Sequence, residues 1–241
     1  MLQKTRGIVF FTTNYSEASV IAKIYTEEFG LQSFLLNGVR KQKSRFNKNL
    51  LQHLSTVELV AYYHPNKTLH RVNELSASPQ LSTIPYDIVK SALAIFIAEV
   101  LHRSIQEEEP NLELFNFLHH SIELLDNSNK DCSKFHLSLM MQLSRYLGFY
   151  PRDGYNSEAI FFDLQEGIYI AQHPSHPNYL NASLSKKFYE FTQLRFDTLQ
   201  NISITADERK QLLHALILFY ELHHTQGVRL RSYLVLEEVM G

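Results

Sequence analysis

The amino-acid sequence predicts an α+β protein, in which a small barrel of five β-strands precedes an α-helical domain that carries an inserted β-hairpin. After residue 78 the repeat of apolar side chains changes from about two residues, typical of strands, to about 3.6, typical of helices. The net charge changes sign at the same place. With 241 residues, 44% of them hydrophobic, the chain can bury a substantial core.

Five segments of residues 1–78 are expected to be strands, because they are rich in Val, Ile, Phe, Tyr and Thr and alternate in places between apolar and polar side chains. They are residues 7–13, 19–26, 32–37, 56–63 and 69–75. Turn residues such as Gly30 and Gly38 separate them. Since closure removes the exposed edges of so small a sheet, we predict an N-terminal OB-fold barrel over residues 1–78, with a small sandwich as the alternative.

The second predicted domain, residues 79–241, shows the helical spacing of apolar residues. Helices are expected over residues 86–105, 111–125, 131–147, 185–199, 205–227 and 233–240. Asp131 is the expected N-cap of the third helix, and Gly148 is the left-handed residue that ends it. Thr205 and Glu208 have the spacing of a capping box, which is the best local start signal of a helix in the chain.

Several classes of function find no support in the sequence. No apolar run reaches the roughly 18–20 residues that cross a bilayer, and the N-terminus lacks a signal peptide's apolar segment, so we expect a cytoplasmic protein without a membrane partner. The one cysteine, Cys132, cannot form an internal disulfide or a four-thiolate zinc site. His173 and His176 have no obvious third ligand, so no metal is expected. Since the common nucleotide-binding and hydrolase motifs are missing, we expect neither catalytic residues nor a cofactor.

Positive charge is concentrated in the first domain. Residues 1–78 hold ten Lys and Arg against five Glu, a net charge of +5, whereas the remainder holds 13 basic and 20 acidic residues, a net charge of −7. Five cations within nine residues form the densest cluster: Arg40, Lys41, Lys43, Arg45 and Lys48. Cations that neutralise phosphates release condensed counterions, so this cluster is the candidate DNA-binding site. Lys4 and Arg6 extend the site if barrel closure brings their strand alongside.

Aromatic side chains of the first domain are candidates for stacking on bases. They are Phe34, Phe46, Tyr62 and Tyr63. The commoner role of any single aromatic residue is in the core, so this part of the site depends on which of the rings reach the surface.

Several stretches of the chain match a known family. KTRGIVFFTTNYSEASVIAKIYTEEFG, then GVRKQKSR, and the helical EPNLELFNFL and LSRYLGFYP, resemble the RecO family of bacterial recombination mediators in order and spacing. The resemblance implies an N-terminal OB-fold joined to a helical domain, binding to single- and double-stranded DNA, and strand annealing. It also implies that the protein acts with RecR and single-strand-binding protein to load the recombinase RecA. The implied location is the cytoplasm, at the nucleoid, and no catalysis is implied.

The family's basic stretch matches Arg40, Lys41, Lys43 and Arg45, so the resemblance implies DNA binding there. Many members follow the equivalent of LGFYP with a four-cysteine zinc module. This chain instead has two apolar runs around a turn, residues 159–172, which predict a β-hairpin without cysteine. Zinc is therefore expected to be absent, with the hairpin filling the same place by apolar packing. Two other functions stay open: a protein-interaction adaptor, and an RNA-binding factor that uses the same barrel.

Overall fold

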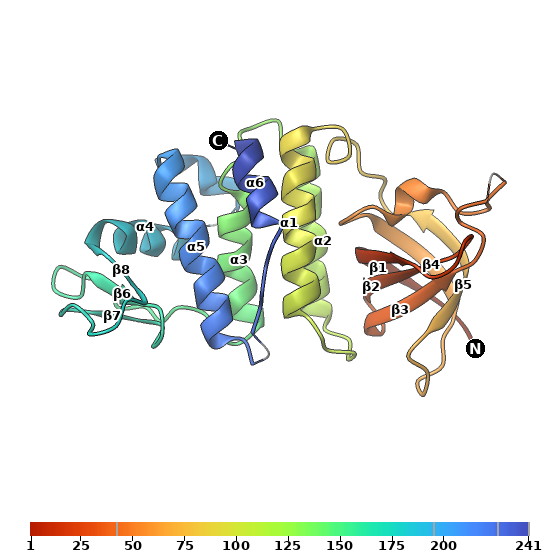
Figure 1. Ribbon diagram of the computed structural model, residues 1–241, viewed down its shortest axis with the longest axis horizontal. Coiled ribbons are helices and arrows are strands. Elements are labelled where there is room, and N and C mark those ends of the chain that lie inside the picture. Colours follow the sequence, from red (N-terminus) through yellow and green to blue (C-terminus); the bar gives the residue numbers. More distant parts are fainter. Residues whose placement is uncertain (42, 195, 226, 241) are drawn as a thin grey trace. The chain divides into compact units, whose positions relative to one another are not determined.

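The computed structural model of this chain describes residues 1–41, 43–194, 196–225 and 227–240. The chain divides into two compact units, Met1–Asn127 and Ser128–Gly241. The first unit holds a barrel and the helices α1 (Ile88–Ser104) and α2 (Leu112–Asn127), and the second holds further helices and a small sheet (Figure 1). Within the described ranges, no helix is long and apolar enough to span a membrane.

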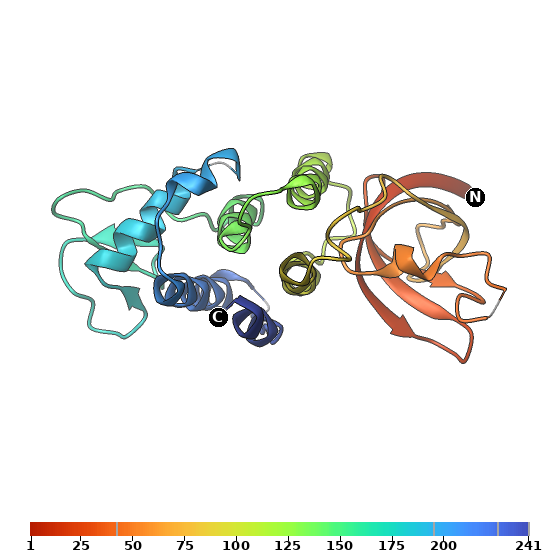
Figure 2. The same cartoon turned by 90° about the horizontal axis from the view of Figure 1, so that it is seen from above.

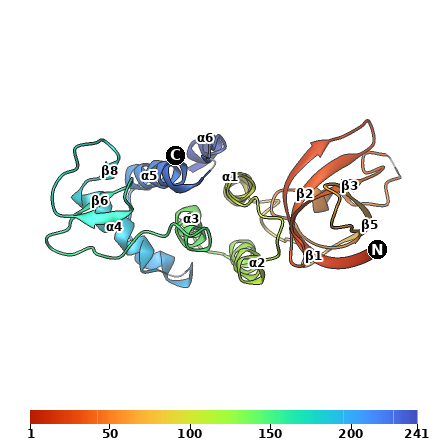
Figure 3. The same ribbon diagram turned by 90° about the horizontal axis from the view of Figure 1, so that it is seen from below.

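Five strands of the first unit close into a barrel in the order β1-β2-β3-β5-β4, with a short 3-10 helix, η1, between β3 and β4. Their bounds are β1 Leu2–Asn14, β2 Val20–Thr26, β3 Gly30–Leu36, η1 Lys48–Leu51, β4 Thr56–Tyr62 and β5 His70–Ala77. β3 and β5 run parallel, and the other neighbouring pairs run antiparallel. The ring of strands is visible in Figures 2 and 3. The predicted barrel is therefore confirmed, and the sandwich alternative is wrong.

The interior of the barrel is filled by apolar side chains from all of its strands, including Val9, Ile24, Phe34 and Leu59, which are almost completely buried. Burying one such side chain stabilises a fold by roughly 1.5–3 kcal/mol relative to leaving it exposed. The register of β1 with β2 shifts between Val9 and Phe11, which marks a bulge. A bulge bends a strand, so the 13-residue β1 can pair with β2 along one half and with β4 along the other.

The loop between α1 and α2 packs on the barrel at the turn between β2 and β3. The Leu31 amide donates a hydrogen bond to the Glu107 carbonyl oxygen at 3.1 Å. Gly30 has a φ of +62°, and a Cβ there would lie 2.5 Å from the Glu109 carbonyl oxygen, so only glycine fits. The barrel and the first two helices thus belong to one compact unit. The domain boundary at residue 78 separates strands from helices and stays a prediction.

The second unit combines helices with a three-stranded sheet in the order β7-β6-β8. Its elements are α3 Phe135–Tyr146, β6 Phe161–Asp163, β7 Ile168–Ile170, β8 Tyr179–Leu180, α4 Ala182–Thr192, η2 Phe196–Asn201, α5 Ala206–His223 and α6 Tyr233–Met240. The predicted hairpin is confirmed as β6 and β7, while β8 is a third strand that the sequence pattern did not reveal. The Phe162 ring lies 4.6 Å from the Phe188 ring and 6.0 Å from the Phe219 ring, so apolar contacts hold the sheet.

Two predicted helix ends are confirmed. The Thr205 hydroxyl accepts a hydrogen bond from the Glu208 amide at 3.1 Å, and the Glu208 carboxylate accepts one from the Thr205 amide at 2.8 Å. This capping box starts α5. Gly148 has a φ of +84°, the left-handed conformation expected just after α3.

Three other predicted helix details are wrong. Asp131 does not cap α3, because α3 begins after Lys134 without a side-chain cap. The Asp131 carboxylate instead accepts a hydrogen bond from the Ser133 amide at 2.8 Å and so stabilises a local turn. The helix expected over residues 185–199 is divided into α4 and the short helix η2, and the helix expected over residues 205–227 ends about one turn early.

The carboxylate of Asp126, in the last turn of α2, holds the segment that leads from the barrel to α1. It accepts hydrogen bonds from the backbone amides of Ser82, Thr83 and Ile84 at 2.7, 2.8 and 2.8 Å. The buried Lys90 ammonium donates to the Asp126 carbonyl oxygen at 2.9 Å. Burial alone would raise the pKa of Asp126, but the backbone donors outweigh it, so the pKa lies below its usual 3.8.

The Asp126→Ala substitution should lower the free energy of unfolding by about 3 kcal/mol, because it leaves the amides of Ser82, Thr83 and the buried Ile84 without this acceptor. Urea unfolding of the full chain measures this loss. Since the folded pKa is depressed, the stability due to this carboxylate is complete above pH of about 4 and disappears as the pH falls through the folded value. The variant should lack this part of the acid sensitivity.

The exposed Asp131, whose carboxylate accepts hydrogen bonds from the amide and hydroxyl of the nearby Ser133, is the matched control. Asp131→Ala should cost under about 1 kcal/mol. Equal losses for the two variants would show that the Asp126 network does not hold the connecting segment.

Candidate nucleic-acid interface

The cationic loop, defined here as residues 38–48, is fixed to the barrel near both ends. Val39 and Phe46 are only 2% and 4% exposed, and both belong to the barrel core. The Arg40 amide donates to the Ala18 carbonyl oxygen at 3.2 Å, which ties the loop to the turn between β1 and β2. In Figure 1 the loop lies beside η1, on the side of the barrel away from α1 and α2. It is therefore held by the fold at defined points.

All five cations of the cationic loop are exposed and have no ion pair within the described part of the chain: Arg40, Lys41, Lys43, Arg45 and Lys48. The sequence gives a reason, because no Asp or Glu occurs between Glu28 and Glu58. Exposed cations without carboxylate partners can exchange their counterions for the phosphates of a polyanion. Gln42, within the same loop, lies outside the described residues.

Arg45 is held more firmly than its neighbours. Its guanidinium carbon lies 4.6 Å from the centre of the Phe46 ring, and its Nη2 atom donates to the Val72 carbonyl oxygen at 3.4 Å. Stacking on an aromatic ring orients the guanidinium plane and leaves edge donors available. Arg45 is thus a cation of fixed orientation at the end of the loop.

Arg6 and Lys4, the other predicted contacts, have carboxylate partners on the barrel. The Arg6 guanidinium donates to both Glu27 carboxylate oxygens at 2.8 and 2.6 Å and lies 5.3 Å from the centre of the Phe115 ring. The hydrogen bond from Arg6 lowers the pKa of Glu27. Lys4 lies 2.9 Å from Glu58. Their charges are balanced within the protein, which argues against their part in the site, and they stay untested predictions.

The predicted aromatic candidates divide into buried and exposed rings. Phe34 and Phe46 are buried in the barrel core, which was the commoner of the two roles considered for them, so neither ring can stack on a base. Tyr63 stacks on Phe29 with ring centres 3.9 Å apart, while Tyr62 is 51% exposed. Whether an aromatic ring packs in the core or can stack on a base depends on its exposure. The alternation of residues along a strand does not reveal this exposure for each ring.

Sequence analysis missed a pocket of about 250 Å³ in the first unit, which lies between η1 and the segment before α1. Asn47 and Asn49, on either side of Lys48, line it together with Tyr86. Tyr86 is 79% exposed. The only sequence feature that could have indicated this pocket is an aromatic residue directly after Pro85, at the start of a helix. Such a residue belongs to no motif with a recognisable spacing.

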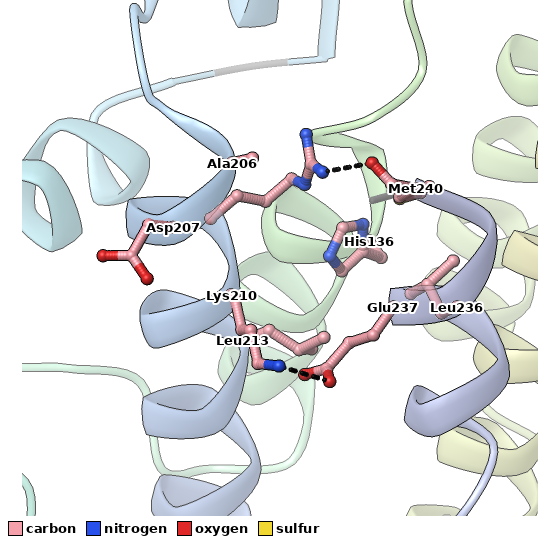
Figure 4. Close-up of a pocket in the computed structure, with 9 residues that line it drawn as sticks. His136, Ala206, Asp207, Lys210, Leu213, Leu236, Glu237 and Met240 are labelled. Carbon is pink, nitrogen blue, oxygen red and sulfur yellow. Dashed lines mark hydrogen bonds and ion pairs between the residues drawn. The ribbon is translucent and has the colours of Figure 1, made fainter.

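A second pocket, of about 280 Å³, lies in the second unit among α3, α5 and α6 (Figure 4). Leu213 and Leu236 give it apolar walls. The Lys210 ammonium pairs with the Glu237 carboxylate at 3.0 Å, as the dashed line in Figure 4 shows, and both residues line the pocket. Burial lowers the pKa of the His136 imidazole in this pocket to about 3, so that ring is neutral.

The histidines considered as metal ligands have protein partners instead. His176 lies 3.1 Å from the Asp163 carboxylate, and His173 is hydrogen-bonded to the Tyr179 hydroxyl. Over the residues that the structure describes, no group of three or more His, Cys, Asp or Glu side chains is placed to hold a metal ion.

The closed five-stranded barrel with its cationic loop, followed by helices and a small sheet, defines the class of OB-fold proteins that carry a helical C-terminal part. Two family models match the chain. They are Recombination protein O N terminal over residues 1–79 and Recombination protein O C terminal over residues 85–233.

Named relatives match over the whole length. The chain is 37% identical over 241 residues to the DNA repair protein RecO of Phocaeicola vulgatus, with all of both chains covered. It is 36% identical over 241 residues to that of Bacteroides fragilis and 35% over 239 residues to that of Flavobacterium psychrophilum, each with 99% of both chains covered. The chain therefore belongs to the RecO family of DNA repair proteins, and the resemblance found in the sequence is confirmed.

Arg6→Ala should mainly affect stability, because the Arg6 guanidinium is already paired with Glu27. We expect a loss of about 1 kcal/mol in the free energy of unfolding and an unchanged salt dependence of DNA binding. Lys41→Ala is the matched control, with the opposite expectation of unchanged stability and weaker binding. A fall in the salt slope for Arg6→Ala equal to that for Lys41→Ala would make Arg6 a phosphate contact.

Proposed function

We propose that this protein is a DNA-binding recombination mediator that anneals single strands and helps to load RecA at gaps coated by single-strand-binding protein. Membership of the RecO family supports a role in DNA repair. The observation that carries the DNA-binding part is the cationic loop, whose exposed cations have no ion pair with the rest of the described chain. The proposed phosphate contacts are Arg40, Lys41, Lys43, Arg45 and Lys48, whereas the ion pairs of the outlying candidates Lys4 and Arg6 argue against these two.

Annealing fits the physics of such a loop. Two complementary strands repel each other through their phosphates, and cations that neutralise both backbones lower this repulsion. Contacts to phosphates do not depend on sequence, so one surface serves single strands and duplexes alike. The mediator needs no catalytic residue for this task, and none is part of the proposal.

The remaining parts of the proposal follow from the family resemblance. RecR and single-strand-binding protein are the proposed protein partners, in the cytoplasm at the nucleoid. The proposal assigns nucleic-acid binding to a domain of residues 1–78, which a helical domain of residues 79–241 follows. No cofactor is part of it.

Replacing Arg40, Lys41, Lys43 and Arg45 together by Ala should weaken DNA binding and flatten its salt dependence. On single strands each lost phosphate contact should reduce the slope of log affinity against log salt by about 0.7. Titration of a labelled oligonucleotide at several salt concentrations measures both quantities. The matched control replaces four exposed cations of the second unit, Lys130, Arg152, Lys186 and Arg229, by Ala and should keep the slope.

Equal slopes for the loop variant and the wild type would remove the cationic loop from the site. Competition among single-stranded DNA, duplex DNA and RNA at one salt concentration tests the ligand class. A clear preference for RNA, or no binding to any of the three, would overturn the proposed function.

The pocket of Figure 4 is our proposed site for the tail of single-strand-binding protein. An acidic, hydrophobic tail needs an apolar groove beside positive charge. Leu213 and Leu236 supply apolar walls, and Lys210 supplies an ammonium that is half exposed. Solvent weakens the pair of Lys210 with Glu237, because the Lys210 side chain is 53% exposed. An incoming carboxylate can replace Glu237, which also lies 2.6 Å from the His214 imidazole.

Lys210→Glu should weaken the binding of a peptide with the sequence of that tail by about fivefold, the equivalent of about 1 kcal/mol for an exposed charge pair. Fluorescence anisotropy of the labelled peptide measures this. Lys186→Glu, at an exposed position of α4, is the control and should leave peptide binding unchanged. Unchanged affinity in Lys210→Glu would exclude this pocket as the docking site.

A further inference from the structure

The pocket of about 250 Å³ in the first unit has chemistry that the phosphate contacts do not explain. One wall is formed by η1 and its flanks, including Asn47 and Asn49, and the other by the segment that enters α1, including Gln80 and Tyr86. Because Asn47 and Asn49 lie on either side of Lys48, the pocket begins where the cationic loop ends.

No described residue that lines the pocket carries a charge. Its polar side chains include the carboxamides of Asn47, Asn49, Gln52 and Gln80. The Asn47 side-chain oxygen accepts from the Asn49 amide at 3.0 Å, whereas no hydrogen bond within the described chain engages the side-chain amides of Gln52 and Gln80. A carboxamide presents a donor and an acceptor side by side, which matches the edges of nucleobases. An uncharged lining favours neither a phosphate nor a metal ion.

Tyr86 gives the pocket an exposed aromatic ring. Its backbone is held, because Pro85 precedes it and its amide donates to the Thr83 carbonyl oxygen at 3.0 Å. Its side chain is nevertheless 79% exposed. A large ring kept in water at a fixed place can bury its face by stacking on a base, which is how proteins hold single strands without regard to sequence.

We propose that this pocket takes one unstacked base of single-stranded DNA, stacked on Tyr86 and hydrogen-bonded by Gln52 and Gln80, while the cationic loop holds neighbouring phosphates. This inference rests on the proposed DNA binding and adds a strand preference to it. The volume is below the roughly 300–1,000 Å³ of ligand pockets for larger molecules, so it suits one base. Bases in a duplex are paired and stacked, so they cannot enter without being extruded.

The test compares two oligonucleotides with equal numbers of phosphates: oligodeoxythymidylate, and the same backbone without bases. The full-length wild type should bind the first about tenfold more tightly. Tyr86→Ala should remove this difference without changing the salt slope, and Tyr86→Phe should retain it. Gln80→Ala, at an exposed position, should reduce the difference by about fivefold.

Tryptophan fluorescence can report directly on the stacking of a base at position 86. Because the chain contains no tryptophan, Tyr86→Trp introduces a single one at the pocket. Oligodeoxythymidylate should quench its fluorescence by stacking, whereas the backbone without bases should not. Tyr146→Ala and Tyr146→Trp, at an exposed ring of α3 in the second unit, are the matched controls, and Tyr62→Ala tests the competing exposed candidate for stacking on β4.

The outcomes separate this inference from the proposed function. Equal affinity of the wild type for both oligonucleotides, with a normal salt slope, would overturn the base pocket and leave DNA binding intact. Loss of the base-dependent affinity in Tyr62→Ala with its retention in Tyr86→Ala would also overturn it. Failure of the wild type to bind either oligonucleotide would overturn the proposed function as well.

Discussion

Barrel closure is the constraint on which the rest of the first unit depends, and closure depends on β1. This strand pairs with β2 from Gly7 to Asn14 and with β4 from Leu2 to Ile8. The bulge after Val9 lets one strand serve two neighbours. An open sheet would not enclose the core into which Val39 and Phe46 insert, and the cationic loop would lose its anchors.

Cations on the strands and cations on the loop have different surroundings for a geometric reason. Arg6 lies opposite Glu58 in the register of β1 with β4, and its own carboxylate partner, Glu27, directly follows β2. Side chains on neighbouring strands are close enough to pair. The loop between β3 and η1 has no cross-strand neighbours, so its charges remain exposed to a ligand. The topology of the barrel thus pairs Arg6 within the protein and leaves the cations of the loop available.

Different interactions stabilise the irregular segments of the two units: hydrogen bonds in the first unit and mainly aromatic packing in the second. In the first, the buried carboxylate of Asp126 gathers three backbone amides of the connecting segment. In the second, Phe162 holds the small sheet against Phe188 and Phe219, and the Ser185 hydroxyl accepts from the Phe162 amide at 2.8 Å. Such packing is compatible with the hypothesis that the hairpin replaces a zinc module of other family members.

Sequence patterns alone were enough to predict the five strands of the barrel, the change from strands to helices, the capping box at Thr205 and the cluster of cations that starts at Arg40, but not β8 or the division of the helix expected over residues 185–199. These features depend on residues within about four positions of each other, through periodicity, turn chemistry and caps. The three-dimensional fold was needed to find that Arg6 is paired, that Phe34 is buried, and that Tyr86 is exposed beside a pocket. Ion pairing and exposure depend on residues far apart in the sequence, such as Arg6 and Glu27, which are separated by 21 positions, and the register of the closed barrel brings them together.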